Sequence, residues 1–94
     1  MTQLNTIGKT ATSIYTSEDG MTAIRYHATE VVKFNEKQII LNTGGWFTNT
    51  TKNRMNQVSS QFNLGYHVFQ KDFEWFVGYK GNTYDFFSNM ILER

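Results

Sequence analysis

The chain has 94 residues, a formal net charge of +1 and a hydrophobic fraction of 39%, which together indicate one small domain with a modest core. Its near-neutral charge excludes the strongly basic class of nucleic-acid-binding proteins, so any contact with nucleic acid would need a local basic patch. The sequence has no cysteine for a disulfide or a thiolate metal site and no apolar run of membrane-spanning length, so we expect a cytoplasmic protein without membrane contact.

The first half of the chain predicts an arm followed by β-hairpins. Residues 1–10 are polar and show no period, so we expect a flexible N-terminal arm before a single domain over residues 11–94. Asp19-Gly20 is a strong hairpin signal, and residues 35–37 favour a second reversal. The β pattern predicts strands over residues 11–17, 21–28, 31–34 and 38–43.

One helix is predicted from residue 50 to about residue 62. Its apolar stripe has the helical offsets 0, 4, 7 and 11, and is formed by Thr51, Met55, Val58 and Phe62. The opposite, solvent-facing side is expected to carry Asn53, Asn56, Gln57 and Ser60. Lys52 and Arg54 fall on the two flanks of the stripe, so both charges are expected to reach solvent. Gly65 supplies a C-terminal stop.

The remainder of the chain is aromatic and strand-like. We expect strands over residues 66–70, 73–80 and 83–88, with residues 90–92 as a last strand or a cover for the core. In the second of these strands one face is expected to carry Phe73, Trp75, Val77 and Tyr79. The resulting fold class is α+β, an antiparallel sheet of about five or six strands in hairpins with one helix packed on one face, in the order βββ-α-βββ.

The turn and helix start over residues 44–56 form the candidate binding site. Two glycines permit close backbone approach, threonines offer capping oxygens, and Trp46 is expected to pack between sheet and helix. Basic residues in the first turns of a helix oppose its dipole, and an anionic partner would explain their presence there. The simpler interpretation is a capped helix that lies on a half-buried tryptophan. The candidate binding residues are Gly44, Gly45, Trp46, Thr48, Thr50, Thr51, Lys52, Arg54 and Asn56.

The sequence offers little support for catalysis or for a bound metal or cofactor. His27 and His67 lie on separate predicted strands without the close spacing of known metal sites. No serine follows the pattern of a nucleophile elbow, and Gly44-Gly45 lacks the spacing and the Gly-Lys-Thr ending of a P-loop. We therefore expect a protein that is not an enzyme and has no metal or cofactor.

The C-terminal half contains more aromatic residues than one sheet face can bury, so a few should lie outward. Outward aromatic side chains can stack nucleic-acid bases or anchor a protein partner. Glu74 and Asp85 interleave with these aromatics, and this mixing of charge favours a protein partner over a nucleic acid.

Four stretches of the sequence, within residues 26–31, 41–57, 62–66 and 70–75, resemble a small domain that is common in bacteriophage genomes. The most specific part is the motif Gly-Gly-Trp…Thr-Thr-Lys…Arg-Met-Asn, which begins at Gly44, and the resemblance covers roughly residues 22–92. It implies a phage-encoded early or accessory protein that acts inside the bacterial host. We thus expect a host or phage protein to bind through residues 44–56; the alternative is a nucleic-acid or nucleotide-phosphate binding module that uses the same surface.

Overall fold

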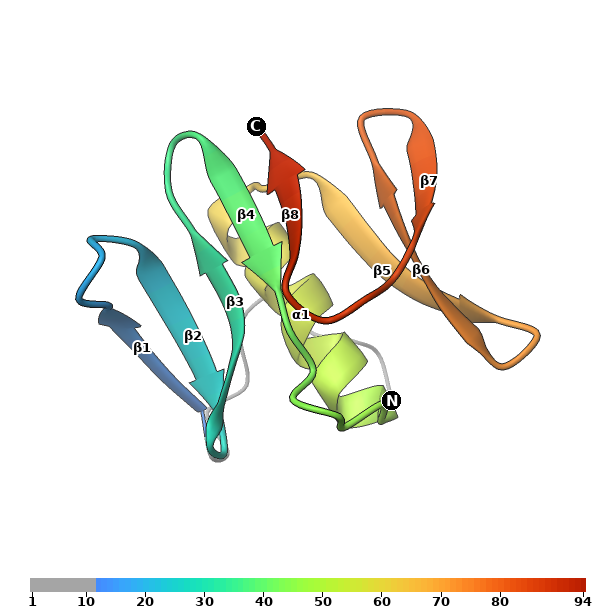
Figure 1. Ribbon diagram of the computed structural model, residues 1–94, viewed down its shortest axis with the longest axis horizontal. Helices are drawn as coiled ribbons and strands as arrows, with labels where there is room; N and C mark the ends of the chain where they lie inside the picture. Colours follow the sequence, from blue (N-terminus) through green and yellow to red (C-terminus); the bar gives the residue numbers. More distant parts are fainter. Residues whose placement is uncertain (1–11) are drawn as a thin grey trace.

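The computed structural model describes residues 12–94, and the arm expected over residues 1–10 lies outside this range. The described chain contains one α-helix and two antiparallel sheets (Figure 1). The predicted α+β class, with β-hairpins before and after one helix, is confirmed. The strands are divided between two sheets, however, instead of forming one.

The larger sheet has five strands in the order β1-β2-β3-β4-β8. Its first four strands follow one another as antiparallel neighbours, and the Asp19-Gly20 turn between the first two is confirmed, with Gly20 at φ +83°. The last strand comes from the C-terminal end of the chain and pairs with β4, so residues 90–92 do form a strand. The bounds are β1 Thr12–Thr16, β2 Thr22–Tyr26, β3 Thr29–Phe34, β4 Gln38–Leu41 and β8 Met90–Glu93.

The smaller sheet has three strands, β5 Tyr66–Lys71, β6 Glu74–Tyr79 and β7 Asn82–Asp85. Trp75, Val77 and Tyr79 lie on its buried face as predicted. The prediction for Phe73 was wrong, because this side chain is 95% exposed. Lys71 pairs with Glu74, so Asp72 and Phe73 form a two-residue turn and do not belong to a strand.

Helix α1 spans Asn49–Phe62, in agreement with the predicted segment. Thr48 caps its first turn, and Asn63, in the left-handed conformation at φ 55°, ends it before Gly65 is reached. Thr51, Met55 and Val58 of the predicted stripe are buried. The helix lies behind β3, β4 and β8 in Figure 1 and packs on the inner face of the larger sheet.

The core fills the space between the two sheets and α1. Its fully buried members are mainly aliphatic residues of the larger sheet, the helix and the smaller sheet: Ile24, Val31, Val32, Ile39, Leu41, Met55, Val58, Val68 and Val77. Burying each such side chain stabilises the fold by about 1.5–3 kcal/mol relative to leaving it exposed.

The polar face predicted for α1 does not all face solvent, because Asn56 and Gln57 are buried. The Asn56 side-chain amide donates to the Val68 carbonyl at 2.8 Å and accepts from the Val68 N–H at 2.8 Å. Ser59 Oγ donates to the Tyr66 carbonyl at 2.7 Å. Helix side chains therefore occupy the backbone edge of β5, so no strand of the larger sheet pairs there and the strands form two sheets.

Candidate functional site

The Gly44-Gly45 segment forms a tight turn that links β4 to the start of α1. Both glycines have positive φ, 63° and 89°, and the Trp46 N–H closes the turn on the Thr43 carbonyl at 3.1 Å. The Gly45 N–H donates to Thr43 Oγ1 at 3.1 Å, and the Gly44 N–H donates to Asn42 Oδ1 at 2.9 Å. All three amides of this turn thus have partners within the protein.

The turn also packs closely against the beginning of β3. A Cβ atom on Gly44 would lie 2.4 Å from Thr29 Oγ1 and 2.9 Å from Thr29 Cγ2. Only glycine permits this approach together with the positive φ. The contact holds the turn, and Trp46 with it, against the end of the β2–β3 hairpin.

The start of the helix is closed by threonine side chains. Thr48 Oγ1 accepts from the Thr51 N–H at 3.2 Å and lies 3.1 Å from Thr51 Oγ1. Thr51 is buried, whereas Thr50 is exposed. The predicted capping role of the threonines is therefore carried by Thr48, and its hydroxyl oxygen is already engaged by the helix.

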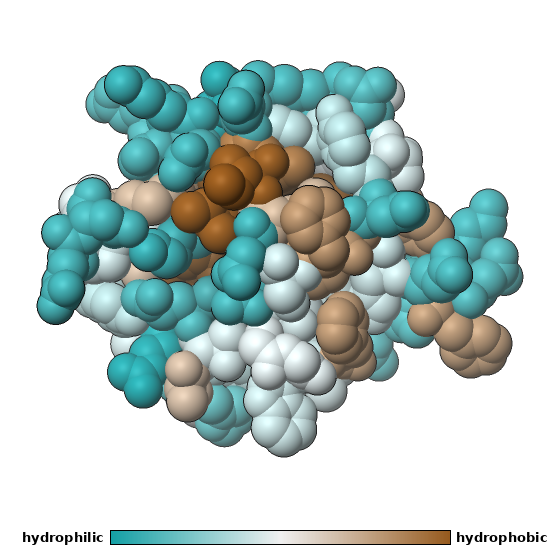
Figure 2. All heavy atoms as spheres, viewed as in Figure 1, coloured by the Kyte–Doolittle hydropathy of each residue, from teal (hydrophilic) through white to brown (hydrophobic). Residues whose placement is uncertain are grey.

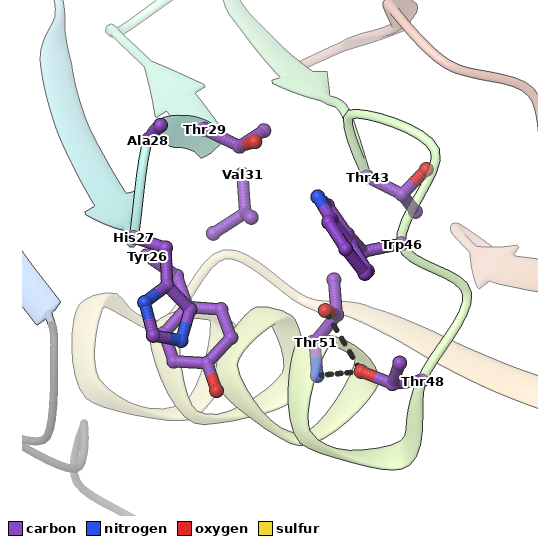
Figure 3. Close-up of a pocket in the computed structure, with 9 residues that line it drawn as sticks. All are labelled: Tyr26, His27, Ala28, Thr29, Val31, Thr43, Trp46, Thr48 and Thr51. Carbon is purple, nitrogen blue, oxygen red and sulfur yellow. Dashed lines mark hydrogen bonds between the residues drawn. The ribbon is translucent and has the colours of Figure 1, made fainter.

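Trp46 does not pack between sheet and helix as predicted, because 67% of its surface is exposed. Its indole instead forms one wall of a pocket of about 420 Å³, facing Tyr26 and His27 on the opposite wall (Figure 3). The glycine turn directs the residue that follows it along the surface of the domain and not into the core. The pocket is lined by Tyr26, His27, Ala28, Thr29, Val31, Thr43, Trp46, Thr48 and Thr51.

The wall formed by residues 26–29 was not predicted from the sequence, whereas Trp46, Thr48 and Thr51 were. Tyr26 pairs with Thr29, so His27 and Ala28 form a two-residue turn, with His27 at φ 55°. This turn contains none of the Gly, Asn, Asp or Pro residues by which such turns are recognised, so residues 21–28 had the pattern of one continuous strand.

Lys52 and Arg54 extend in different directions and are absent from the pocket lining. Lys52 Nζ lies 5.9 Å from the centre of the Trp75 ring, toward the smaller sheet. The Arg54 guanidinium lies 5.5 Å from the centre of the Tyr26 ring, and it donates to Thr12 Oγ1 at 3.2 Å and to Gln57 Oε1 at 3.1 Å. Both side chains are half-buried, and the two charges do not converge on one site.

Asn56 also lies away from the pocket, since its amide is committed to β5.

Across residues 12–94, no group of three or more His, Cys, Asp or Glu side chains is arranged to hold a metal ion. The helix described here is not long and apolar enough to span a membrane.

The predicted surplus of outward aromatic side chains is present. Figure 2 shows apolar side chains gathered over β4 and β8, where Ile40 pairs with the exposed Ile91. The exposed aromatic residues are Tyr15, Trp46, Phe47, Phe73, Tyr84 and Phe87. Two of them, Trp46 and Phe47, are consecutive and contribute to two different hollows, so the surface around the helix start is the most aromatic part of the candidate site.

A family model described as Kyanoviridae Gp96 protein matches residues 2–93. The chain therefore belongs to the Kyanoviridae Gp96 family, a family of phage proteins. This confirms the resemblance to a phage domain at the level of the family. Searches of curated proteins and of solved structures found no match.

Proposed function

We propose that this member of the Kyanoviridae Gp96 family is a non-enzymatic accessory protein that binds a host or phage protein inside the host cell. The binding surface in this proposal is the pocket between the β2–β3 turn and Trp46. The observation that carries the proposal is the tryptophan side chain, 67% exposed, that walls an apolar pocket of about 420 Å³. Tryptophan and tyrosine are enriched among the hot-spot residues of protein interfaces, and binding pockets are typically concave and mostly apolar.

The chemistry of the pocket favours an apolar or aromatic side chain as its occupant. Val31 is buried behind the pocket, while Tyr26 and Trp46 present ring surfaces to it (Figure 3). The hydroxyl of Thr43 already accepts from the Gly45 N–H and lies 3.3 Å from Ser88 Oγ. An incoming ring would therefore be held by burial and ring contacts, which are worth about 0.5–1.5 kcal/mol per aromatic pair beyond the area that is buried.

The alternative, a nucleic-acid or phosphate site at the same surface, has weaker support. A phosphate site needs free backbone amides and converging cations. The amides of Gly45 and Trp46 donate to Thr43, and Lys52 and Arg54 extend toward different sheets. These contacts leave few donors for an anion beside the pocket.

The proposal is tested by affinity capture from the lysate of infected host cells, with and without nuclease treatment. The wild-type chain should retain a discrete protein after nuclease treatment, and Trp46→Ala should lose it by at least about tenfold, as expected for a hot-spot residue. Tyr84→Ala, which removes an exposed aromatic side chain from β7 outside the pocket, is the matched control and should capture the protein normally. Equal capture by Trp46→Ala, or loss of the captured material with nuclease, would contradict the proposal.

A further inference from the structure

Phe47, the residue after Trp46, lines a second and more open hollow of about 530 Å³ on the smaller sheet. Its floor is a set of three aromatic rings in edge-to-face contact. The ring centres of Phe47 and Trp75 are 5.1 Å apart, those of Trp75 and Phe86 are 5.6 Å apart, and those of Phe47 and Phe86 are 6.0 Å apart. We call this hollow the Phe47 groove; Gln70, Phe73, Glu74 and Asp85 complete its lining.

Phe73, at the rim of this groove, occupies a position that does not suit phenylalanine. It is the second residue of the β5–β6 turn, where Asp72 and Phe73 have φ values of 53° and 66°. This type of turn favours Asn-Gly, and a bulky residue at positive φ is rare. The side chain is also 95% exposed at the end of a hairpin that projects from the domain (Figure 1). Neither its conformation nor its exposure stabilises the fold, which suggests a role in binding.

The charges at the rim are negative. Glu74 and Asp85 are exposed, and the lining includes no lysine or arginine among the described residues. Lys52, outside this lining, has its Nζ 5.9 Å from the centre of the Trp75 ring on the groove floor. Lys71 lies opposite Glu74 in the strand register, but within residues 12–94 neither carboxylate forms an ion pair. An aromatic groove with two carboxylates at its rim is complementary to a flat cation.

We propose that the Phe47 groove binds an arginine side chain of the partner protein. The guanidinium group stacks on the Phe73 ring and pairs with the carboxylates of Glu74 and Asp85. Arginine suits these features because its planar group both stacks on rings and forms paired hydrogen bonds to carboxylates. This inference deepens the proposed function and rests on it for the identity of the partner as a protein.

The test uses a blocked amino acid as the probe, so it does not require the partner. We would titrate acetyl-arginine methylamide into the full-length ¹⁵N-labelled chain and follow backbone and indole N–H resonances, with the citrulline analogue as the uncharged control. The expected result is a set of shifts centred on Phe73, Glu74 and Asp85, with citrulline binding about five- to tenfold more weakly. The double variant Glu74→Gln/Asp85→Asn should weaken arginine binding by a similar factor.

Phe73→Asn separates binding from folding. Asparagine tolerates positive φ, so this variant should melt at the same or a higher temperature than the wild type while binding arginine more weakly. The inference is overturned if arginine and citrulline give equal shifts, if the shifts lie away from the groove, or if Phe73→Asn lowers the melting temperature and leaves arginine binding unchanged.

Trp46→Ala should bind the arginine probe normally, because Trp46 lies outside the Phe47 groove. If the arginine probe does not bind the groove while the wild-type chain still captures a protein in a Trp46-dependent way, this inference alone is overturned. Arginine binding without any captured protein would contradict the proposed function alone.

Discussion

Replacement of Asn56 by alanine should destabilise the fold although the residue is polar and lies on a helix. Its amide makes two hydrogen bonds of 2.8 Å to the backbone of Val68, and only 8% of the residue is exposed. Without the amide, a buried N–H and a buried C=O lose their partners, at about 1–3 kcal/mol each. Alanine regains up to about 0.7 kcal/mol through its higher helix propensity. The free energy of unfolding should therefore fall by about 1–5 kcal/mol.

Thermal unfolding followed by circular dichroism would measure this loss. A chain of this size shifts by about 4–8 °C per kcal/mol, so the melting temperature should fall by about 5 °C or more. Hydrogen exchange should show faster exchange at the Val68 amide. Asn53→Ala, on the same helix, is the matched control and should melt close to the wild type. If Asn56→Ala melts like the wild type with Val68 still protected, the proposed role of Asn56 at the edge of β5 is wrong.

Three further predictions concern the turn, the helix flanks and the first hairpin. Gly44→Ala should lower the melting temperature more than Gly45→Ala, because both add a Cβ at positive φ, at about 1–3 kcal/mol of backbone strain, but only the first clashes with a neighbouring side chain. Equal losses would show that the close approach is unimportant. Arg54→Gln should destabilise the fold more than Lys52→Gln, since it loses two hydrogen bonds in addition to a ring contact. Urea titration of both variants measures the difference in unfolding free energy, and the opposite order would contradict this prediction. Hydrogen bonds from a lysine and a serine side chain lower the pKa of Asp19 to about 2. Because this folded-state pKa lies below the ordinary value of 3.8, the stabilisation is present above pH 4 and is lost as the pH falls toward 2. Asp19→Asn should therefore melt lower than the wild type at pH 7, by a difference that shrinks as the pH falls through the folded-state pKa, and a difference independent of pH would refute this.

The elements that could be predicted are those specified by local sequence. The α1 stripe and its threonine cap lie within one segment, and the Asp19-Gly20 turn contains a residue that favours positive φ. The β2–β3 turn was missed because His27-Ala28 has no such residue. Phe73 was misplaced because the alternating pattern of β6 extends into its turn, where only the strand register shows that pairing begins at Glu74.

The division into two sheets depends on contacts between distant segments. The pairing of β4 with β8 and the contact of Asn56 with β5 involve residues far apart in the chain, and hydrophobic periodicity carries no information on either. A polar residue on a helix is normally assigned to solvent, and this assumption failed at Asn56.

Only one wall of the candidate site could be predicted from the sequence, because the site also depends on contacts between distant segments. The glycine turn, Trp46 and the threonines of the helix start were identified because they are consecutive in the sequence. The facing wall, with Tyr26 and His27, comes from a hairpin earlier in the chain. Its position depends on the close approach of Gly44 to Thr29, which becomes visible only in the folded structure.

Site-specific photo-crosslinking at position 46 tests the central proposal most directly. The chain would carry benzoylphenylalanine in place of Trp46 and be irradiated inside infected host cells, with the same label at Tyr84 as the control. We predict one discrete protein adduct that resists nuclease and that the label at position 84 does not form. The absence of an adduct from position 46, identical adducts from both positions, or an adduct that nuclease removes would contradict a protein-binding pocket at Trp46.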